Sequence, residues 1–116
     1  MLKYCYCTLA DTPFFLKEVF ALIQSLINVN SQYPLIVMIP EKTIAEEELN
    51  NFSSAIKQCN LNIKIIKIPF LLFNQRLNYC YNSTINKFWS FALLDYDKIL
   101  FIDADMIITK NIDNIF

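Results

Sequence analysis

Two aspartates one residue apart are the side chains of this sequence best suited to chemistry. Asp103 and Asp105 follow residues 98–102, a short apolar run typical of a buried strand. Residues i and i+2 of an extended chain point to the same side, so both carboxylates can reach one target. Carboxylates that close repel each other unless a cation lies between them or one is protonated. We therefore predict a divalent-metal site for a diphosphate; in the alternative, polar residues simply end a buried strand.

Composition limits the classes of protein to which the chain can belong. The 116 residues are 55% hydrophobic and 18% charged, which is enough to bury the core of one domain. The net charge is −1 and the basic residues are scattered, so no nucleic-acid surface is expected. No apolar run approaches the ~18 residues of a membrane-spanning helix, and the N-terminus lacks the pattern of a signal peptide. We expect a cytoplasmic protein with buried, unpaired cysteine thiols.

The chain contains neither glycine nor histidine. The missing glycine removes the P-loop and the Gly-rich dinucleotide fingerprint. The missing histidine removes Ser-His-Asp and Cys-His nucleophile systems and His-ligated zinc. Any phosphate chemistry in this chain must therefore depend on carboxylates, a metal ion and lysine.

Strand and helix patterns alternate along the sequence. Short apolar or β-branched runs predict strands at residues 3–9, 35–39, 62–68 and 98–102. Apolar residues at helical spacing predict helices at residues 13–28, 43–59 and 83–94. Such alternation with short connections implies an α/β fold with parallel strands and right-handed crossovers.

The helix ends and faces can also be predicted. Asp11 or Thr12 would cap the first helix, and residues 43–46 would form a capping box for the second. The third helix would bury one face, with Phe88 and Trp89 in the core. The members of this face are Ile85, Phe88, Trp89 and Ala92.

The strand order decides which segments meet. If the first strand lies between the second and the fourth, the order is 3-2-1-4 in a three-layer α/β/α, Rossmann-like fold. The switch-point crevice then places residues 9–12 beside residues 103–105. Residues 106–108 would be extended. Residues 69–82 would form a loop that packs on the body of the protein or contacts a missing segment, and Arg76 in this loop could reach a phosphate.

Four features, in this order, resemble the start of the glycogenin-like, family 8 glycosyltransferases. They are TLADT at 8–12 with Phe15 and Ser25-Leu26 after it, Lys87 sixteen residues before Asp103, FIDAD at 101–105 and NIDNIF at 111–116. The resemblance implies a GT-A-type nucleotide-diphospho-sugar transferase domain. It covers nearly the whole chain but only the N-terminal half of that catalytic domain. We therefore expect one domain, residues 1–116, that is a fragment of a longer enzyme.

This resemblance implies metal-dependent transfer of a hexose from a UDP-sugar to a carbohydrate or protein acceptor, with retention. Asp103 and Asp105 would be the metal ligands, and Mn²⁺ (or Mg²⁺) suits their hard oxygen atoms. The ion would bridge the diphosphate and stabilise the charge that develops as the nucleotide leaves. The expected partners are the donor, the acceptor and, in a homo-oligomer, a second copy of the chain, with no nucleic acid and no membrane span.

The resemblance also implies a set of nucleotide-sugar-binding residues. Phe15 would lie beside the uracil ring, unless it is an ordinary core aromatic. Asp11 would serve as a ligand, a helix cap or both, and Lys87 would contact sugar or phosphate, unless it is a solvated helix lysine. The whole set is Leu9, Ala10, Asp11, Thr12, Phe15, Lys87, Asp103, Ala104 and Asp105.

Two other functions are compatible with the sequence. Family members continue to a histidine-containing motif that supplies a third metal ligand, and this chain has no histidine, so a catalytically incomplete nucleotide-binding or interaction module is one alternative. The other is a haloacid-dehalogenase-like phosphatase, which also has Asp-x-Asp after an apolar strand. That family, however, places the motif on its first strand and expects Thr or Val at the position of Ile107.

Overall fold

A parallel sheet organises the computed structural model, which describes residues 2–70 and 84–116. Within these ranges the strands are β1 (Tyr4–Leu9), β2 (Leu35–Pro40), β3 (Ile63–Ile68) and β4 (Lys98–Phe101), in the order β3-β2-β1-β4. The helices are α1 (Pro13–Asn28), α2 (Glu46–Ile56) and two 3-10 helices, η2 (Thr84–Ala92) and η3 (Asp113–Ile115). Every strand pair is parallel, so the predicted α/β class and strand order are confirmed.

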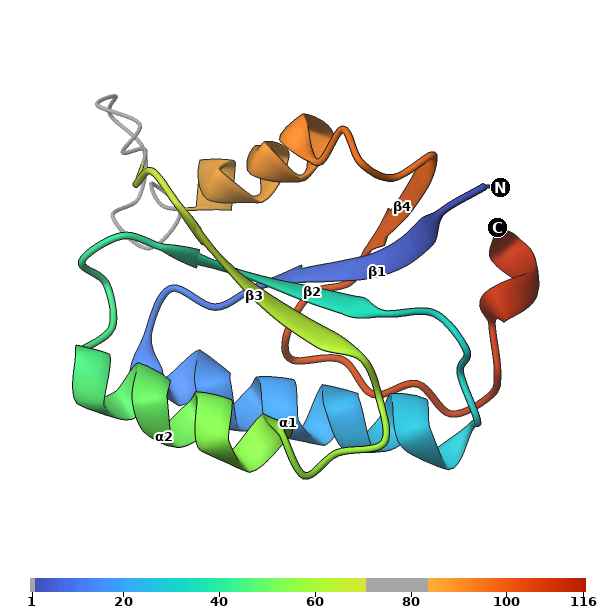
Figure 1. The fold of residues 1–116 in the computed structure, drawn as a ribbon, viewed down its shortest axis with the longest axis horizontal. Coiled ribbons are helices and arrows are strands. Elements are labelled where there is room, and N and C mark those ends of the chain that lie inside the picture. The colour runs from blue at the N-terminus through green and yellow to red at the C-terminus, as the bar shows by residue number, and fades with distance from the viewer. Residues whose placement is uncertain (1, 71–83) are drawn as a thin grey trace.

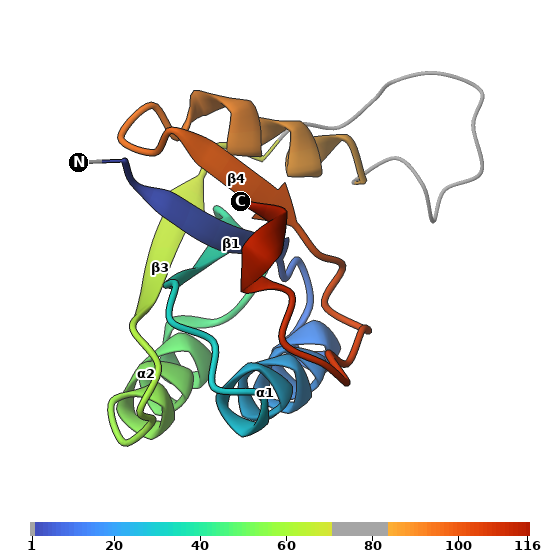
Figure 2. The same ribbon diagram turned by 90° about the vertical axis from the view of Figure 1, so that its right-hand side faces the viewer.

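Helices cover both faces of this sheet. Figure 1 shows α1 and α2 side by side on one face, and Figure 2 shows η2 on the other. Alternate residues of β1 face the two layers: Tyr6 packs with the α1 and α2 side chains, whereas Cys5 and Cys7 pack with Trp89 of η2. All six residues of β2 are buried, as expected for a strand covered on both sides.

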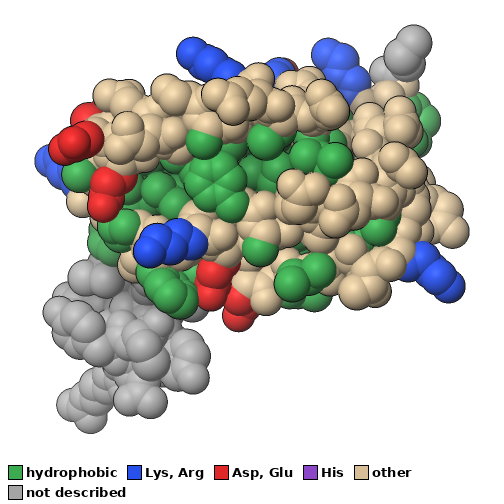
Figure 3. Space-filling model, turned by 90° about the horizontal axis from the view of Figure 1, so that it is seen from below, with side chains coloured by type: hydrophobic (Ala, Val, Ile, Leu, Met, Phe, Trp, Pro, Cys, Tyr) green, Lys and Arg blue, Asp and Glu red, His purple; other side chains and the backbone are tan. Residues whose placement is uncertain are grey.

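The helix layer is held together by aromatic and aliphatic side chains. The Phe20 ring of α1 meets the Phe52 ring of α2 edge to face, with centroids 4.9 Å apart. Leu22 and Leu26 of α1 are fully buried, and each such side chain contributes about 1.5–3 kcal/mol relative to an exposed one. Seen from the helix side, apolar side chains gather between the two helices (Figure 3).

Burial also accounts for the state of two cysteines. Cys5 and Cys7 are fully buried in β1, and burial raises the pKa of Cys5 to about 11 and that of Cys7 to about 12. Both thiols are unpaired and stay protonated at neutral pH. The predicted buried thiols are therefore confirmed at these two positions, while Cys59 is only partly buried and Cys80 lies outside the described residues.

The two predicted caps had different outcomes. Thr12 caps α1, because its side-chain oxygen accepts from the backbone N–H of Phe15, and Pro13 occupies the first turn. The predicted capping box of α2 is wrong. The Thr43 hydroxyl instead donates to the carbonyl of Pro40 at 2.6 Å, which closes the turn after β2, and Ala45 occupies the cap position. This helix also ends at Ile56, earlier than predicted.

The third helix shows the largest difference from the prediction. Residues 84–92 form a 3-10 helix, which has about three residues per turn, instead of the 3.6 on which the prediction is based. Asn86 and Ser90 are buried, whereas Phe88 is 56% exposed and Ala92 is also exposed, so the predicted face is wrong. Trp89 is partly buried, as its predicted core position requires. The side chain of Ile85 lies outside the described part, as do Arg76 and most of the predicted loop.

After β4 the chain turns and runs back along α1 (Figures 1 and 2). Residues 106–108 belong to no strand or helix, and their extended conformation stays a prediction. The segment ends at η3, where the ring of Phe116 stacks on Tyr4 with centroids 5.2 Å apart. None of the helices in the described part of the chain is long and apolar enough to cross a bilayer.

Candidate functional site

A pocket of about 480 Å³ lies at the carboxyl ends of β1 and β4. Its volume falls within the ~300–1,000 Å³ typical of small-molecule sites. This is the switch point of the sheet, where the chain leaves β1 toward one face and reaches β4 from the other. The lining residues are Leu9, Asp11, Phe15, Lys87, Phe101, Asp103, Ala104 and Asp105.

The register of β1 and β4 explains why these residues meet. Cys7 lies opposite Phe101, and the N–H of Ile102 donates to the carbonyl of Cys7 at 2.8 Å. Two residues further along this register, Leu9 is the last residue of β1 and Asp103 lies just past the end of β4. The predicted proximity of residues 9–12 and 103–105 therefore follows from the pairing of two parallel strands.

The two aspartates reach the pocket through a turn. The strand β4 ends at Phe101, and the N–H of Met106 donates to the carbonyl of Asp103 at 3.2 Å. This turn buries Ala104, which is 5% exposed, and leaves both carboxylates exposed. The predicted convergence along an extended chain is therefore wrong in its geometry, although both side chains line the same pocket.

The corner between β1 and α1 forms the opposite wall. Leu9, Asp11 and Phe15 line the pocket, and Phe15 also packs partly buried against the core. Two other predicted residues do not line it: Ala10 is buried in the core, and Thr12 caps α1. All the other predicted site residues are lining residues.

Lys87 and Phe101 complete the lining from the η2 side. The side chain of Lys87 is exposed, and its Nζ lies 6.0 Å from the ring centroid of Phe88. Phe101 was not assigned to the site by the sequence analysis. It could have been found from its place near the end of the apolar run, two residues before Asp103.

The charge of the lining determines what the pocket can hold. Asp11, Asp103 and Asp105 supply three carboxylates, against one ammonium group from Lys87. A bare diphosphate would be repelled by this surplus of negative charge, whereas a divalent cation would be attracted. The electrostatics thus favour a cation, or an anion that arrives with one.

The donor atoms fit one kind of metal site. In the described ranges, no group of three or more His, Cys, Asp or Glu side chains could hold a metal ion. Asp103 and Asp105 alone offer two carboxylates, which is the protein share of many Mg²⁺ sites, in which substrate phosphates and water supply the other ligands. The residues therefore fit a hard divalent ion that binds together with a phosphate-bearing ligand.

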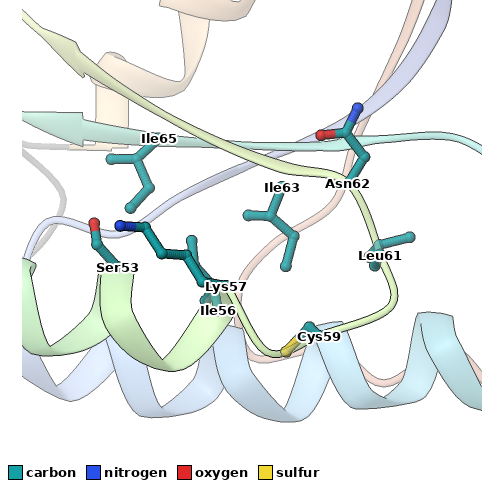
Figure 4. A pocket seen from close by; sticks show the side chains of 8 residues that line it. All are labelled: Ser53, Ile56, Lys57, Cys59, Leu61, Asn62, Ile63 and Ile65. Atoms are coloured by element: carbon teal, nitrogen blue, oxygen red, sulfur yellow. The ribbon is translucent and has the colours of Figure 1, made fainter.

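A second pocket, of about 350 Å³, lies between the end of α2 and β3 (Figure 4). Its lining residues are Ser53, Ile56, Lys57, Cys59, Leu61, Asn62, Ile63 and Ile65. It contains no carboxylate and lies toward the amino end of its strand, opposite to the end where parallel sheets bind ligands. The pocket between β1 and β4 is therefore the better candidate site.

Fold and pocket together define an α/β protein whose candidate ligand site lies at the switch point of a parallel sheet. Comparison with known proteins specifies the class further, because residues 8–116 match the family described as "Mannosyltransferase putative". The chain belongs to this family of glycosyltransferases.

Two relatives are similar over most of the chain. The uncharacterized protein R707 of Acanthamoeba polyphaga mimivirus is 29% identical over 121 residues, which cover 100% of this chain and 41% of that protein. The UDP-glucuronate:xylan alpha-glucuronosyltransferase 2 of Arabidopsis thaliana is 33% identical over 95 residues, which cover 82% of this chain and 15% of that protein. The chain thus spans less than half the length of these relatives. The matched family and the glucuronosyltransferase relative support a glycosyltransferase family without selecting the glycogenin-like one.

Proposed function

We propose that the chain is the nucleotide-sugar-binding part of a metal-dependent glycosyltransferase. In this proposal a UDP-sugar donor gives its hexose to a carbohydrate or protein acceptor. The observation that supports it best is the pocket that gathers Leu9, Asp11, Phe15, Lys87 and the Asp103–Asp105 turn at the switch point. The glucuronosyltransferase relative carries UDP-glucuronate in its name, which agrees with a UDP-linked donor.

The side chains of the pocket would have distinct roles. Asp103 and Asp105 would hold Mn²⁺ or Mg²⁺, which supplies positive charge to the diphosphate as the nucleotide leaves. Phe15 and Leu9 offer the apolar surface on which a uracil ring would rest. Lys87 would donate to a phosphate or sugar oxygen from the opposite wall. Retention of configuration and the GT-A assignment rest on the glycogenin-like resemblance.

A non-catalytic nucleotide-binding module is the second candidate. It is favoured by the donor set of the pocket, since no group of three or more His, Cys, Asp or Glu side chains among the described residues could hold a metal ion. Catalysis requires that donor and acceptor be positioned together. The phosphatase alternative is weakened because the Asp-x-Asp motif follows β4, beside β1, instead of lying on the first strand.

Calorimetric titration of UDP, with and without Mn²⁺, tests the proposed site. We expect binding that depends on Mn²⁺ and is lost in Asp105→Asn, because that change removes one of two metal-binding carboxylates. Asp95→Asn is the matched control, since Asp95 is exposed and does not line the pocket. Equal binding with and without Mn²⁺, or unchanged binding in Asp105→Asn, would disprove the metal site. Turnover of a UDP-sugar then separates an enzyme from a binding module.

A further inference from the structure

A buried hydroxyl on α1 holds the chain just after the acidic turn. Ser25 is 5% exposed and lies on the core-facing side of the helix. Its Oγ donates to the carbonyl of Leu22 at 2.7 Å and accepts from the backbone N–H of Ile108 at 2.9 Å. Because the hydroxyl proton is used within the helix, an oxygen lone pair is left for Ile108.

The turn with the two aspartates is thereby fixed at both ends. On one side the N–H of Ile102 donates to the carbonyl of Cys7 in β1. On the other side Ile108 is bound to Ser25, three residues after Asp105. Residues 103–107 thus span two anchors that belong to different elements, the sheet and α1.

A serine at this position is otherwise hard to explain. Its neighbours on the buried face of α1 are Leu22 and Leu26, so an aliphatic residue would add more apolar burial. Serine is also unfavourable inside helices, because its hydroxyl competes for backbone hydrogen bonds. The hydrogen bond to Ile108 links this helix position to the segment that carries the two aspartates.

We propose that Ser25 is a positioning residue that sets the spacing of the Asp103 and Asp105 carboxylates for a metal-bound diphosphate. This inference rests on the proposed function and adds a residue outside the pocket lining. Ser25 touches neither ligand nor metal in this proposal. It acts through Ile108 and the short segment that leads back to Asp105.

The far end of the same segment provides a matched control. The Ser31 hydroxyl donates to Asp113 at 2.7 Å, eight residues after Asp105. Ser31→Ala and Ser25→Ala therefore each remove one hydroxyl that holds the segment following β4. Only Ser25 does so next to the acidic turn.

The test compares Mn²⁺ affinity in the presence of UDP for the wild-type chain and four variants. Residues that orient metal ligands typically change metal affinity by about 10–100-fold, and we expect Ser25→Ala to weaken binding about tenfold. Ser25→Thr retains a hydroxyl and should stay near the wild-type affinity. Ser25→Cys fills the space with a weak acceptor, and its affinity should fall between those of Ser25→Thr and Ser25→Ala. Ser31→Ala should lower thermal stability with little change in affinity.

Amide hydrogen exchange without ligand separates this proposal from the function on which it rests. Faster exchange at Ile108 and Met106 in Ser25→Ala and Ser25→Cys, but not in Ser31→Ala, would support the anchor. If exchange confirms the anchor but the wild-type chain shows no Mn²⁺-dependent UDP binding, the proposed function fails instead. Equal affinity in Ser25→Ala and Ser31→Ala, or unchanged exchange at Ile108 in Ser25→Ala, would overturn the positioning role.

Discussion

Ala104 lies between the two aspartates and turns its side chain into the core. Its methyl group belongs to the same buried cluster as Leu22 and Ile102, while the carboxylates on either side of it are exposed. This small buried residue therefore fixes the orientation of the turn. A residue with a longer side chain would have to push the turn away from α1 or displace core side chains.

We predict that Ala104→Leu destabilises the fold by about 1–3 kcal/mol, the usual effect of overpacking a core. The same change should weaken Mn²⁺-dependent UDP binding, because it moves both carboxylates. Urea unfolding and calorimetry measure the two effects. Ala21→Leu, at an exposed position of α1, is the control and should change stability by no more than about 0.5 kcal/mol. Wild-type stability in Ala104→Leu would show that the turn is not packed as described.

The acidic pair could be predicted from the sequence, but its geometry could not. Two aspartates after an apolar run favour a site whatever their backbone conformation, since carboxylates that close repel each other unless a cation lies between them or one is protonated. The turn that presents them depends on the burial of Ala104 and on the anchors at Ile102 and Ile108. These contacts join residues that are far apart in the sequence, so local sequence patterns do not predict them.

At the scale of the elements, a cluster of polar side chains holds the segment that follows the Asp103–Asp105 turn. The carboxylate of Asp113 accepts hydrogen bonds from the Tyr6 hydroxyl at 2.5 Å, from Ser31 and from the backbone N–H of Gln32. Asn111 donates to the carbonyl of Val29 after α1. These bonds fix the return path of the chain along α1.

This cluster gives stability a pH dependence. Burial alone would raise the pKa of Asp113, but hydrogen bonds from Tyr6, Gln32 and Ser31 outweigh it and lower the pKa below the usual 3.8. Because the folded pKa is lowered, the stabilisation is present above that usual value and disappears as pH falls through the folded pKa.

We predict that Asp113→Asn lowers the free energy of unfolding by about 1–3 kcal/mol near neutral pH, since hydrogen bonds to a charged group are lost. The gap between wild type and variant should narrow below the usual pKa of 3.8, where Asp113 becomes protonated. Urea unfolding at several pH values measures this. A gap that does not change with pH would refute the role of the charge, and Asp95→Asn, at an exposed turn, should show no such gap.

The helix η2 shows where element prediction from the sequence fails. An amphipathic pattern fits a helix but does not decide which side faces the sheet: Asn86 and Ser90 are buried in this 3-10 helix, whereas Phe88 is exposed. The capping box also failed: the Thr43 hydroxyl donates to the carbonyl of Pro40, and Ala45 occupies the cap position of α2. In both cases a competing local geometry prevailed over the commoner one.

On the scale of the whole molecule, the sheet order was the most predictable property. The continuous apolar run of β2 indicated a strand covered on both faces, and short crossovers left few topologies open. The order β3-β2-β1-β4 then determines which strand ends face each other and hence where the pocket lies. The fold and the location of the candidate site can thus be predicted from patterns of burial in the sequence. The detailed contacts within the site cannot.

The central position of β1 predicts the reactivity of the cysteines. Cys5 and Cys7 are fully buried, with pKa values raised by burial, whereas Cys59 is partly exposed. We expect a thiol reagent to modify Cys59 in the folded protein, and Cys5 and Cys7 only when the whole chain unfolds. Peptide mapping by mass spectrometry assigns each site. Labelling of Cys7 as fast as that of Cys59 would be inconsistent with β1 as a central strand.

The most direct test of the central claim, a metal-bound diphosphate at the Asp103–Asp105 turn, is NMR of the isotope-labelled chain with UDP during titration with paramagnetic Mn²⁺. Mg²⁺ serves as the diamagnetic reference. The amide signals of residues 9–11 and 103–105 should broaden first, while those of residues 57–63, beside the second pocket, should stay sharp. Broadening centred away from the turn, or no residue-specific broadening in a folded sample, would contradict the proposed site.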